Sequence, residues 1–202
     1  RLFRPDKNME RLNHSMSTVS MPAFNPEGMV ECIKKLVKME ESWIPTEDGY
    51  SVYLRPTAIG TNGNLGVTTP TSAKLYCICG PTGPYFASGF KPVKLYADTV
   101  NVRAWPGGVG NSKLGGNYGP TIAPATKAME ELGCAQILWL FGEDHQVTEV
   151  GAMNIMFVIK DKVTGKPELI TAPLDRGDIL AGITRYSILD LARAGKFGDM
   201  DV

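Results

Sequence analysis

Apolar residues recur at helical spacing in two stretches near the start of the chain. In the first, three apolar residues lie three and four positions apart, directly after the polar residues 6–8, and this pattern predicts a helix. In the second, an apolar stripe over residues 30–37 follows Asn25 and Pro26, which are typical of a helix N-cap and a first helical turn. The stripe of the first helix consists of Met9, Leu12 and Met16.

Stretches rich in β-branched and aromatic residues predict strands. One covers residues 50–56, where Tyr53 and Arg55 are two positions apart and therefore point to the same face of the strand. That face is either exposed to solvent or part of a site, and the pattern alone does not separate the two. Further strands are predicted at residues 2–5, 73–79, 93–97, 136–141, 153–159 and 168–172.

The remaining pattern predicts two helices and a connection between domains. One helix covers residues 124–132 and is closed by Gly133. The other reaches about residue 194, with Ile188 and Leu191 on its apolar side. A turn-rich segment at residues 80–89 breaks the periodicity. The chain thus contains both helices and strands, and we expect a mixed α/β fold.

Composition narrows the classes of function. The 202 residues include 21 basic and 21 acidic side chains, and a formal net charge of zero argues against a nucleic-acid partner. No apolar run approaches the roughly 20 residues of a membrane span, so no membrane partner is expected. The four cysteines are scattered, and we expect reduced thiols in an intracellular protein. The chain starts at Arg1 without methionine, and we expect a fragment; an upstream targeting peptide stays open.

A glycine-rich segment at residues 105–120 carries the first candidate for chemistry. Six glycines surround Lys113, and glycine lets the backbone bend tightly and approach a ligand. We expect a buried loop in which poor solvation favours the neutral, nucleophilic amine, so that Lys113 is a candidate to form a Schiff base. A surface turn with the lysine in water is the alternative. A phosphate-binding loop is excluded, because Leu114 follows the lysine where that motif needs Ser or Thr.

Glu149 is the second candidate, because it lies between Val147 and Val150. A carboxylate in such apolar surroundings needs a partner, since burial otherwise raises its pKa and neutralises it. A protonated pyridine nitrogen and a salt bridge to a lysine or arginine are the two alternatives. No metal site is expected, since Glu143, Asp144 and His145 are adjacent in sequence and adjacent ligands rarely converge on one ion.

Three motifs together resemble a known family. Residues 113–118 read Lys-Leu-Gly-Gly-Asn-Tyr, residues 103–105 read Arg-Ala-Trp, and residues 148–154 read Thr-Glu-Val-Gly-Ala-Met-Asn. They resemble the branched-chain amino-acid aminotransferases, which are pyridoxal-phosphate enzymes of fold type IV, and the similarity runs from Arg4 to Leu191. It implies two α/β domains, both incomplete here: a small domain in residues 1–82, a linker at 83–92 and a cofactor-binding domain in 93–202.

The resemblance also implies roles for individual residues. Lys113 would be the catalytic residue and carry pyridoxal 5'-phosphate as a Schiff base, Tyr118 would contact the phenolic oxygen of the cofactor, and Glu149 its ring nitrogen. The guanidinium of Arg11 and the backbone amides at a helix start would bind its phosphate. The amide residues are Ile183 and Thr184, and the residues on the substrate side are Tyr53, Tyr85 and, in a supporting role, Arg55.

The implied reaction is amino transfer between leucine, isoleucine or valine and 2-oxoglutarate. The implied partners are small amino acids and 2-oxo acids, and a second copy of the chain in a homodimer; the implied compartment is the cytoplasm or the mitochondrion. Ala152, where many relatives carry threonine, and Pro106 depart from the family pattern, so substrate contacts could differ. Alternatives are a D-amino-acid aminotransferase, an aminodeoxychorismate lyase, and a non-catalytic truncated paralogue.

Overall fold

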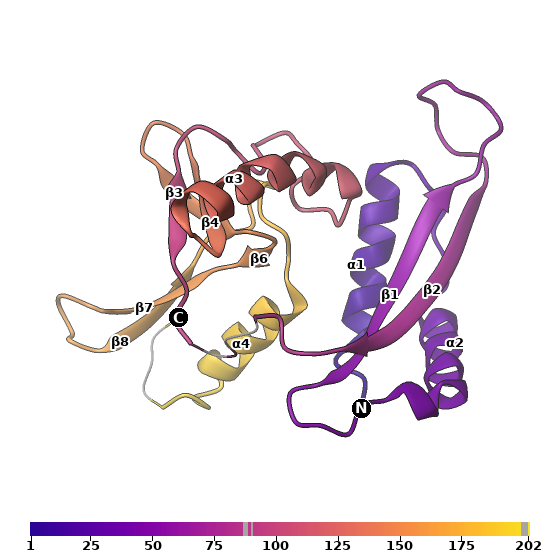
Figure 1. Ribbon diagram of the computed structural model, residues 1–202, viewed down its shortest axis with the longest axis horizontal. Helices are drawn as coiled ribbons and strands as arrows, with labels where there is room; N and C mark the ends of the chain where they lie inside the picture. The colour runs from indigo at the N-terminus through magenta and orange to yellow at the C-terminus, as the bar shows by residue number, and fades with distance from the viewer. Residues whose placement is uncertain (87–88, 90, 199–201) are drawn as a thin grey trace. The chain divides into compact units, whose positions relative to one another are not determined.

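The computed structural model describes residues 1–86, 89, 91–198 and 202. It divides into two compact units, Arg1–Pro92 and Val93–Val202, and each is described by itself. Figure 1 shows both helices and strands in each unit, which confirms the predicted mixed α/β class. Three residues of the expected linker, Ala87, Ser88 and Phe90, lie outside the described residues.

Two helices open the first unit. Helix α1 covers Pro5–Thr18 and helix α2 covers Pro26–Met39, followed by the short 3-10 helix η1 at Glu41–Trp43. The predicted cap of α2 is confirmed, because the Asn25 side chain accepts a hydrogen bond of 2.9 Å from the Gly28 backbone N–H. Each helix buries part of its predicted apolar stripe, namely Met9, Met16 and Ile33.

The strand predicted at residues 2–5 is wrong. Arg4 has φ 44° and ψ 55°, a left-handed conformation, and Pro5 is already the first residue of α1. Proline at the first helical position has its φ preset for a helix and lacks an N–H that would in any case be unpaired there. The helix therefore begins where the apolar and aromatic composition predicted a strand.

A long hairpin completes the first unit. Strand β1 covers Ser51–Gly60 and pairs antiparallel with β2, Ala73–Thr82. Strand β2 extends beyond its predicted end, through Pro81, which lies opposite Val52. Both strands are edges of a two-stranded sheet, so a proline without an N–H is tolerated where the missing donor faces outward. Residues 80–82 thus belong to the sheet and not to the turn-rich segment.

The second unit contains a four-stranded sheet in the order β3-β4-β5-β6. Helix α3 lies between β3 and β4 in sequence and ends, as predicted, at Gly133 with φ 62°. Buried Ala128 of α3 packs with Cys134, Ile137 and Trp139 in one core cluster. The elements are β3 at Leu95–Asp98, α3 at Ile122–Leu132, β4 at Gln136–Phe141, β5 at Gln146–Val150 and β6 at Met153–Asn154, with short 3-10 helices at Gly115–Asn117 and Gly119–Thr121.

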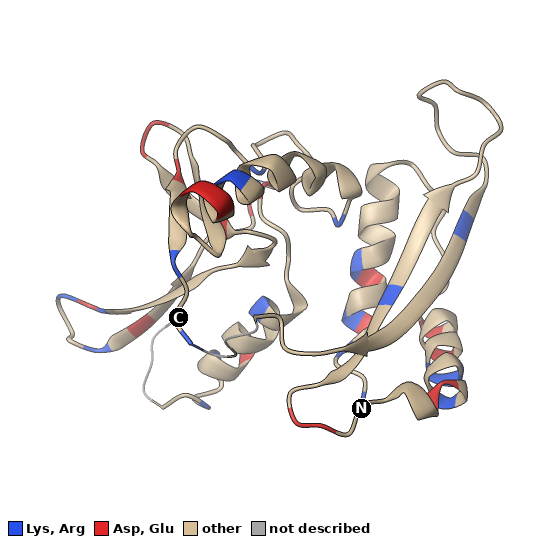
Figure 2. Cartoon of the chain, in the orientation of Figure 1, with Lys and Arg blue, Asp and Glu red and all other residues tan. Residues whose placement is uncertain are grey.

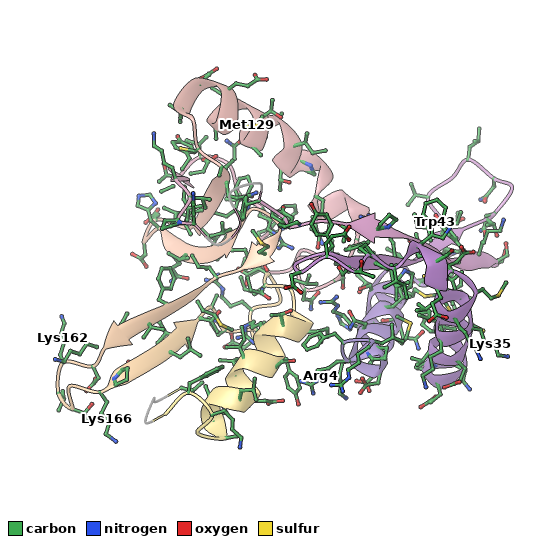
Figure 3. All side chains as sticks on the ribbon, turned by 60° about the horizontal axis from the view of Figure 1, so that its bottom comes forward. Arg4, Lys35, Trp43, Met129, Lys162 and Lys166 are labelled. Atoms are coloured by element: carbon green, nitrogen blue, oxygen red, sulfur yellow. The ribbon has the colours of Figure 1, made fainter. Side chains whose placement is uncertain are left out.

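A second hairpin and helix α4 form a separate core cluster in this unit. Strand β7, Met156–Lys160, pairs antiparallel with β8, Pro167–Thr171, and Figure 3 shows Lys162 and Lys166 at the tip of this hairpin. Helix α4 covers Ile183–Arg193. The cluster consists of Leu169, Leu189 and Ala192, with Met156 and Ile188 packed against it.

Two predictions about this region are wrong. The single strand expected at residues 153–159 is interrupted at Ile155, and its two parts belong to different sheets. Leu191 was expected on the buried side of α4 but is 45% exposed, because the helix turns Leu189 and Ala192 toward the core instead. An apolar run read from sequence cannot show where a strand leaves one sheet for another.

Charge is mixed along the chain. Figure 2 shows acidic and basic residues interspersed along α1 and α2, where two of the pairs, Lys7–Glu10 and Lys34–Glu31, form exposed salt bridges. Among the helices described, none combines the length and apolar character that crossing a membrane requires.

Candidate active site

Lys113 lies in the long connection between β3 and α3, in a loop that is fixed by hydrogen bonds between its own residues. The side-chain nitrogen of buried Asn117 donates hydrogen bonds of 2.8 Å to the carbonyls of Val109 and Ser112. The backbone N–H of Ser112 also donates to Val109, and that of Leu114 donates to Ser112, each at 3.0 Å. These bonds fix the backbone on both sides of the lysine.

The lysine loop is docked against the segment that precedes α4. The Asn111 N–H donates to the Gly177 carbonyl at 3.0 Å. A Cβ atom at Gly110 would lie only 2.4 Å from the Asp178 carbonyl oxygen and 2.5 Å from the Ala104 side chain. Glycine is therefore required at position 110 for the two segments to meet.

The Lys113 side chain is exposed, which corrects the expectation of a buried amine. Its Nζ donates a 2.8 Å hydrogen bond to Tyr118 Oη and lies 4.5 Å from the centroid of that ring. The glycine-rich backbone buries Ser112 and Asn117, whereas the long lysine side chain reaches along the surface to the tyrosine. The structure thus brings together the amine and the phenol that the motif predicted.

Glu149, on β5, is buried as predicted, with 2% exposure. Its Oε2 lies 2.6 Å from Arg103 Nε, and its Oε1 accepts a 2.7 Å hydrogen bond from Asn154 Nδ2. Of the two partners considered from sequence, the salt bridge to an arginine is therefore present. Burial raises the pKa of Glu149. Three smaller effects lower it: the charge of Arg103, a hydrogen bond with the Leu180 backbone, and the charge of Lys113.

Arg103 links the glutamate to the tyrosine. It is 5% exposed, its Nη1 donates to the Asp178 carbonyl at 3.3 Å, and its Cζ lies 5.8 Å from the Tyr118 ring centroid. Lys113, Tyr118, Arg103 and Glu149 therefore form a continuous row of contacts. Sequence reasoning used Arg103 only as part of a motif and assigned it no role; it allowed a salt bridge between Glu149 and a lysine or arginine, but no local signal identified Arg103 as that partner.

Ile183 and Thr184 are the first two residues of α4, as predicted. The N–H groups of a first helical turn have no partner within the helix and can bind an anion. Gly182, which precedes them, has extended backbone with φ −65° and ψ 131° and offers no capping side chain. A Cβ there would lie 2.0 Å from Asn154 Oδ1, so this helix start lies against the residue that holds Glu149.

The other predicted site residues belong to the first unit. Arg11 lies on α1, half-buried, with its Nη2 3.4 Å from Asn8 Oδ1. Tyr53 and Arg55 share one face of β1, as predicted, and the Arg55 Cζ lies 5.2 Å from the Tyr53 ring centroid. Tyr85 is exposed after β2.

The chain is similar to known proteins over most of its length. A profile described as amino-transferase class IV matches residues 1–198. A branched-chain-amino-acid aminotransferase of Monosiga brevicollis is 54% identical over 96% of this chain, and a cytosolic one of Saccharomyces cerevisiae is 52% identical over 95%. These matches cover 49% and 50% of the two relatives, so the chain spans about half their length.

Solved structures share the fold. A branched-chain aminotransferase of Thermoproteus uzoniensis with norvaline superposes with a TM-score of 0.78 at 22% identity, covering 98% of this chain and 61% of that one. A T.th. branched-chain amino acid aminotransferase complexed with N-(5'-phosphopyridoxyl)-L-glutamate gives a TM-score of 0.76 at 25% identity, covering 99% and 61%.

Proposed function

This chain belongs to the class IV aminotransferase family, and we propose that the protein transfers amino groups between branched-chain amino acids and 2-oxoglutarate with pyridoxal 5'-phosphate as cofactor. Relatives about half identical to it are named branched-chain-amino-acid aminotransferases, which supports leucine, isoleucine and valine as substrates. The observation that carries the proposal is the row of contacts from Lys113 through Tyr118 and Arg103 to Glu149.

The chemistry of these residues fits that cofactor. Among the described residues, Glu149 Oε2 forms an ion pair with Arg103 but accepts no hydrogen bond. A buried carboxylate oxygen without a donor suits a protonated ring nitrogen. The Lys113 amine suits an aldehyde, and the Tyr118 phenol suits a phenolic oxygen. The backbone N–H groups at the start of α4 suit a phosphate. Pyridoxal phosphate, when bound, supplies a carbonyl that takes up the amino group and a ring that delocalises electrons.

Each residue in the row of contacts then has a proposed role. Lys113 Nζ would hold the cofactor covalently at rest and, as a neutral amine, move the proton of the substrate α-carbon. Tyr118 Oη, 2.8 Å from that nitrogen, would orient it and contact the phenolic oxygen. The Glu149 carboxylate would keep a proton on the ring nitrogen, while Arg103 offsets the cost of burying its charge.

The first unit would contribute phosphate and substrate contacts. We propose that Arg11 binds the cofactor phosphate together with the backbone amides of Ile183 and Thr184. Tyr53 and Tyr85 would face the substrate, and the cation–π contact between Arg55 and Tyr53 would hold that tyrosine in place. The remaining parts of the proposal are a homodimer and an intracellular location; relatives at similar identity are named both cytosolic and mitochondrial.

The decisive experiment is to trap the cofactor on Lys113. The protein, expressed from its complete natural reading frame, is mixed with pyridoxal phosphate, reduced with borohydride and digested, and the modified peptide is identified by mass spectrometry. We expect the adduct on Lys113 and a loss of amino transfer of about a hundredfold or more in Lys113→Ala, because that variant lacks the amine that moves the proton. Lys127→Ala, which removes an exposed lysine of α3, is the matched control and should behave like wild type.

The same assay separates the alternatives. L-leucine, L-isoleucine and L-valine should serve as amino donors to 2-oxoglutarate, whereas D-alanine should not. Turnover with D-alanine alone would favour a D-amino-acid aminotransferase. Absence of both adduct and turnover in the wild-type protein would overturn the proposal in favour of a non-catalytic paralogue.

A further inference from the structure

Asn154 is the only residue of β6 whose side chain bonds to Glu149 among the described contacts, and no pattern in the sequence predicted a role for it. Glu149 and Asn154 are paired positions on the antiparallel strands β5 and β6. Asn154 Nδ2 donates to Glu149 Oε1 at 2.7 Å and to the Leu180 carbonyl at 2.9 Å. Both neighbours are acceptors, so the nitrogen of this amide must face them, and both of its hydrogens are used.

The oxygen of the same amide lies against the entry to α4. A Cβ at Gly182 would come within 2.0 Å of Asn154 Oδ1, so no other residue fits at this position without moving the asparagine. The Gly182 N–H donates to the Leu180 carbonyl at 2.8 Å, and the Gly182 carbonyl accepts from the Tyr186 N–H at 2.9 Å. Asn154 therefore contacts the glutamate with its nitrogen, while its oxygen lies against Gly182, the residue directly before α4.

We infer that Asn154 is a positioning residue that fixes the spacing between the Glu149 carboxylate and the N-terminus of α4. The inference rests on the proposed function, in which Glu149 contacts the ring nitrogen of the cofactor and Ile183 and Thr184 its phosphate. The groups that contact the two ends of this rigid cofactor, its ring nitrogen and its phosphate, are then kept at a fixed distance by the Asn154 side chain. Displacing Asn154 should therefore weaken the contacts at both ends together.

The chemistry of the amide explains why asparagine suits this position. A neutral donor holds the Glu149 carboxylate in place without adding charge beside it. Aspartate has nearly the same shape but would set a second carboxylate against Glu149 and would place an acceptor against the Leu180 carbonyl. Alanine would leave that carbonyl with the Gly182 N–H as its remaining donor among these contacts.

The test compares two ligands that differ only in the phosphate. Dissociation constants of pyridoxal phosphate and of pyridoxal are measured by absorbance for wild type, Asn154→Asp and Asn154→Ala, each in the complete natural protein. We expect Asn154→Asp to weaken pyridoxal binding by about tenfold or more, the scale of a lost hydrogen bond to a charged group. We also expect the preference for pyridoxal phosphate over pyridoxal, which reports the phosphate contact, to fall severalfold.

Asn101 supplies a matched control. Its Nδ2 also donates to a buried carboxylate, Asp98 Oδ2, at 2.9 Å, but outside the row of site residues. Asn101→Asp and Asn101→Ala should lower the melting temperature of the cofactor-free protein without changing the preference between the two ligands. A role of Asn154 in stability alone would give the same result as this control.

The outcomes are distinguishable. If wild type binds pyridoxal phosphate on Lys113 and the Asn154 variants keep the wild-type preference, the inference is overturned and the proposed function stands. If wild type binds neither ligand, the proposed function fails and the inference with it. Should the aspartate variant not fold, Asn154→Ser, which is smaller and uncharged, is measured in its place, and an unchanged preference there overturns the inference.

Discussion

Glu149 is the residue at which burial and charge pairing oppose each other most directly. Burial raises its pKa, because a charged carboxylate loses its hydration, while Arg103 at 2.6 Å favours the charged form. The balance lies on the side of burial, so the folded protein holds a proton on this carboxyl to a higher pH than the unfolded chain does. A group of this kind makes stability depend on pH.

We predict that Glu149→Gln changes the pH dependence of unfolding in the cofactor-free protein. In wild type, the protonation of Glu149 contributes to the free energy of unfolding. This contribution is complete below the unfolded pKa of 4.5 and is lost as pH rises through the higher folded pKa. The free energy of unfolding of wild type minus that of Glu149→Gln should therefore be larger at pH 4 than at pH 7. Each pKa unit of the shift contributes about 1.4 kcal/mol to that difference.

Urea titrations of wild type and Glu149→Gln between pH 4 and pH 7 measure this difference in the free energy of unfolding. Glu168→Gln, on β8, is the control for loss of a glutamate in the same unit. A difference that grew with pH would mean that Arg103 outweighs burial and would contradict the prediction.

Part of this arrangement could be predicted from local sequence. The apolar neighbours Val147 and Val150 correctly indicated that Glu149 is buried and needs a partner. They could not identify Arg103, which is distant in sequence and meets the glutamate only through the fold. The burial of Lys113 was wrongly inferred from its glycines, because flexible backbone sets where a loop can bend and not where a long side chain points.

At the scale of elements, the lysine loop depends on contact with the segment that leads to α4. Gly110 touches the Asp178 backbone, and Asn111 bonds to Gly177, so loop and segment form one docked pair. The segment also carries Leu180, whose carbonyl accepts from Asn154. Displacing the loop should thus disturb Lys113 and Glu149 together.

We predict that Gly110→Ala destabilises the second unit and weakens cofactor binding. The added methyl group would lie 2.4 Å from a backbone oxygen that cannot rotate away, a cost of about 1–3 kcal/mol or more. Gly115→Ala is the matched control, since a Cβ there meets nothing within 4 Å. Thermal melts and pyridoxal phosphate titrations of the two variants should separate them; equal melting temperatures would show that the loop is not tightly docked.

Helices and strands were predicted well where one continuous sequence pattern corresponds to a single element of the structure. The strand at Gln136–Phe141 and the end of α3 at Gly133 were predicted from local signals alone. Predictions failed where tertiary pairing decides the outcome, as at Ile155, between two sheets, and along Gly80–Thr82, where pairing with β1 extends β2 across a glycine and a proline.

At the scale of the whole molecule, the residues to which a cofactor role is assigned come from both halves of the sequence. Lys113, Tyr118 and Glu149 are grouped by contacts within the second unit, whereas Arg11 lies on α1 in the first. No local pattern distinguishes Arg11 from other helix arginines, and its proposed role comes from the family resemblance alone. A test of Arg11 is therefore a test of whether the family's site is assembled in this protein.

We predict that Arg11→Gln weakens pyridoxal phosphate binding about tenfold or more, because a guanidinium gives a phosphate two charge-assisted hydrogen bonds that an amide cannot replace. Pyridoxal, which has no phosphate, should bind the variant as it binds wild type. Lys34→Gln, a loss of the same charge from an exposed side chain of α2, should alter neither constant. A parallel loss of affinity for both ligands would instead mean that Arg11 supports the fold of the first unit, and an unchanged affinity for both would leave phosphate binding to the start of α4.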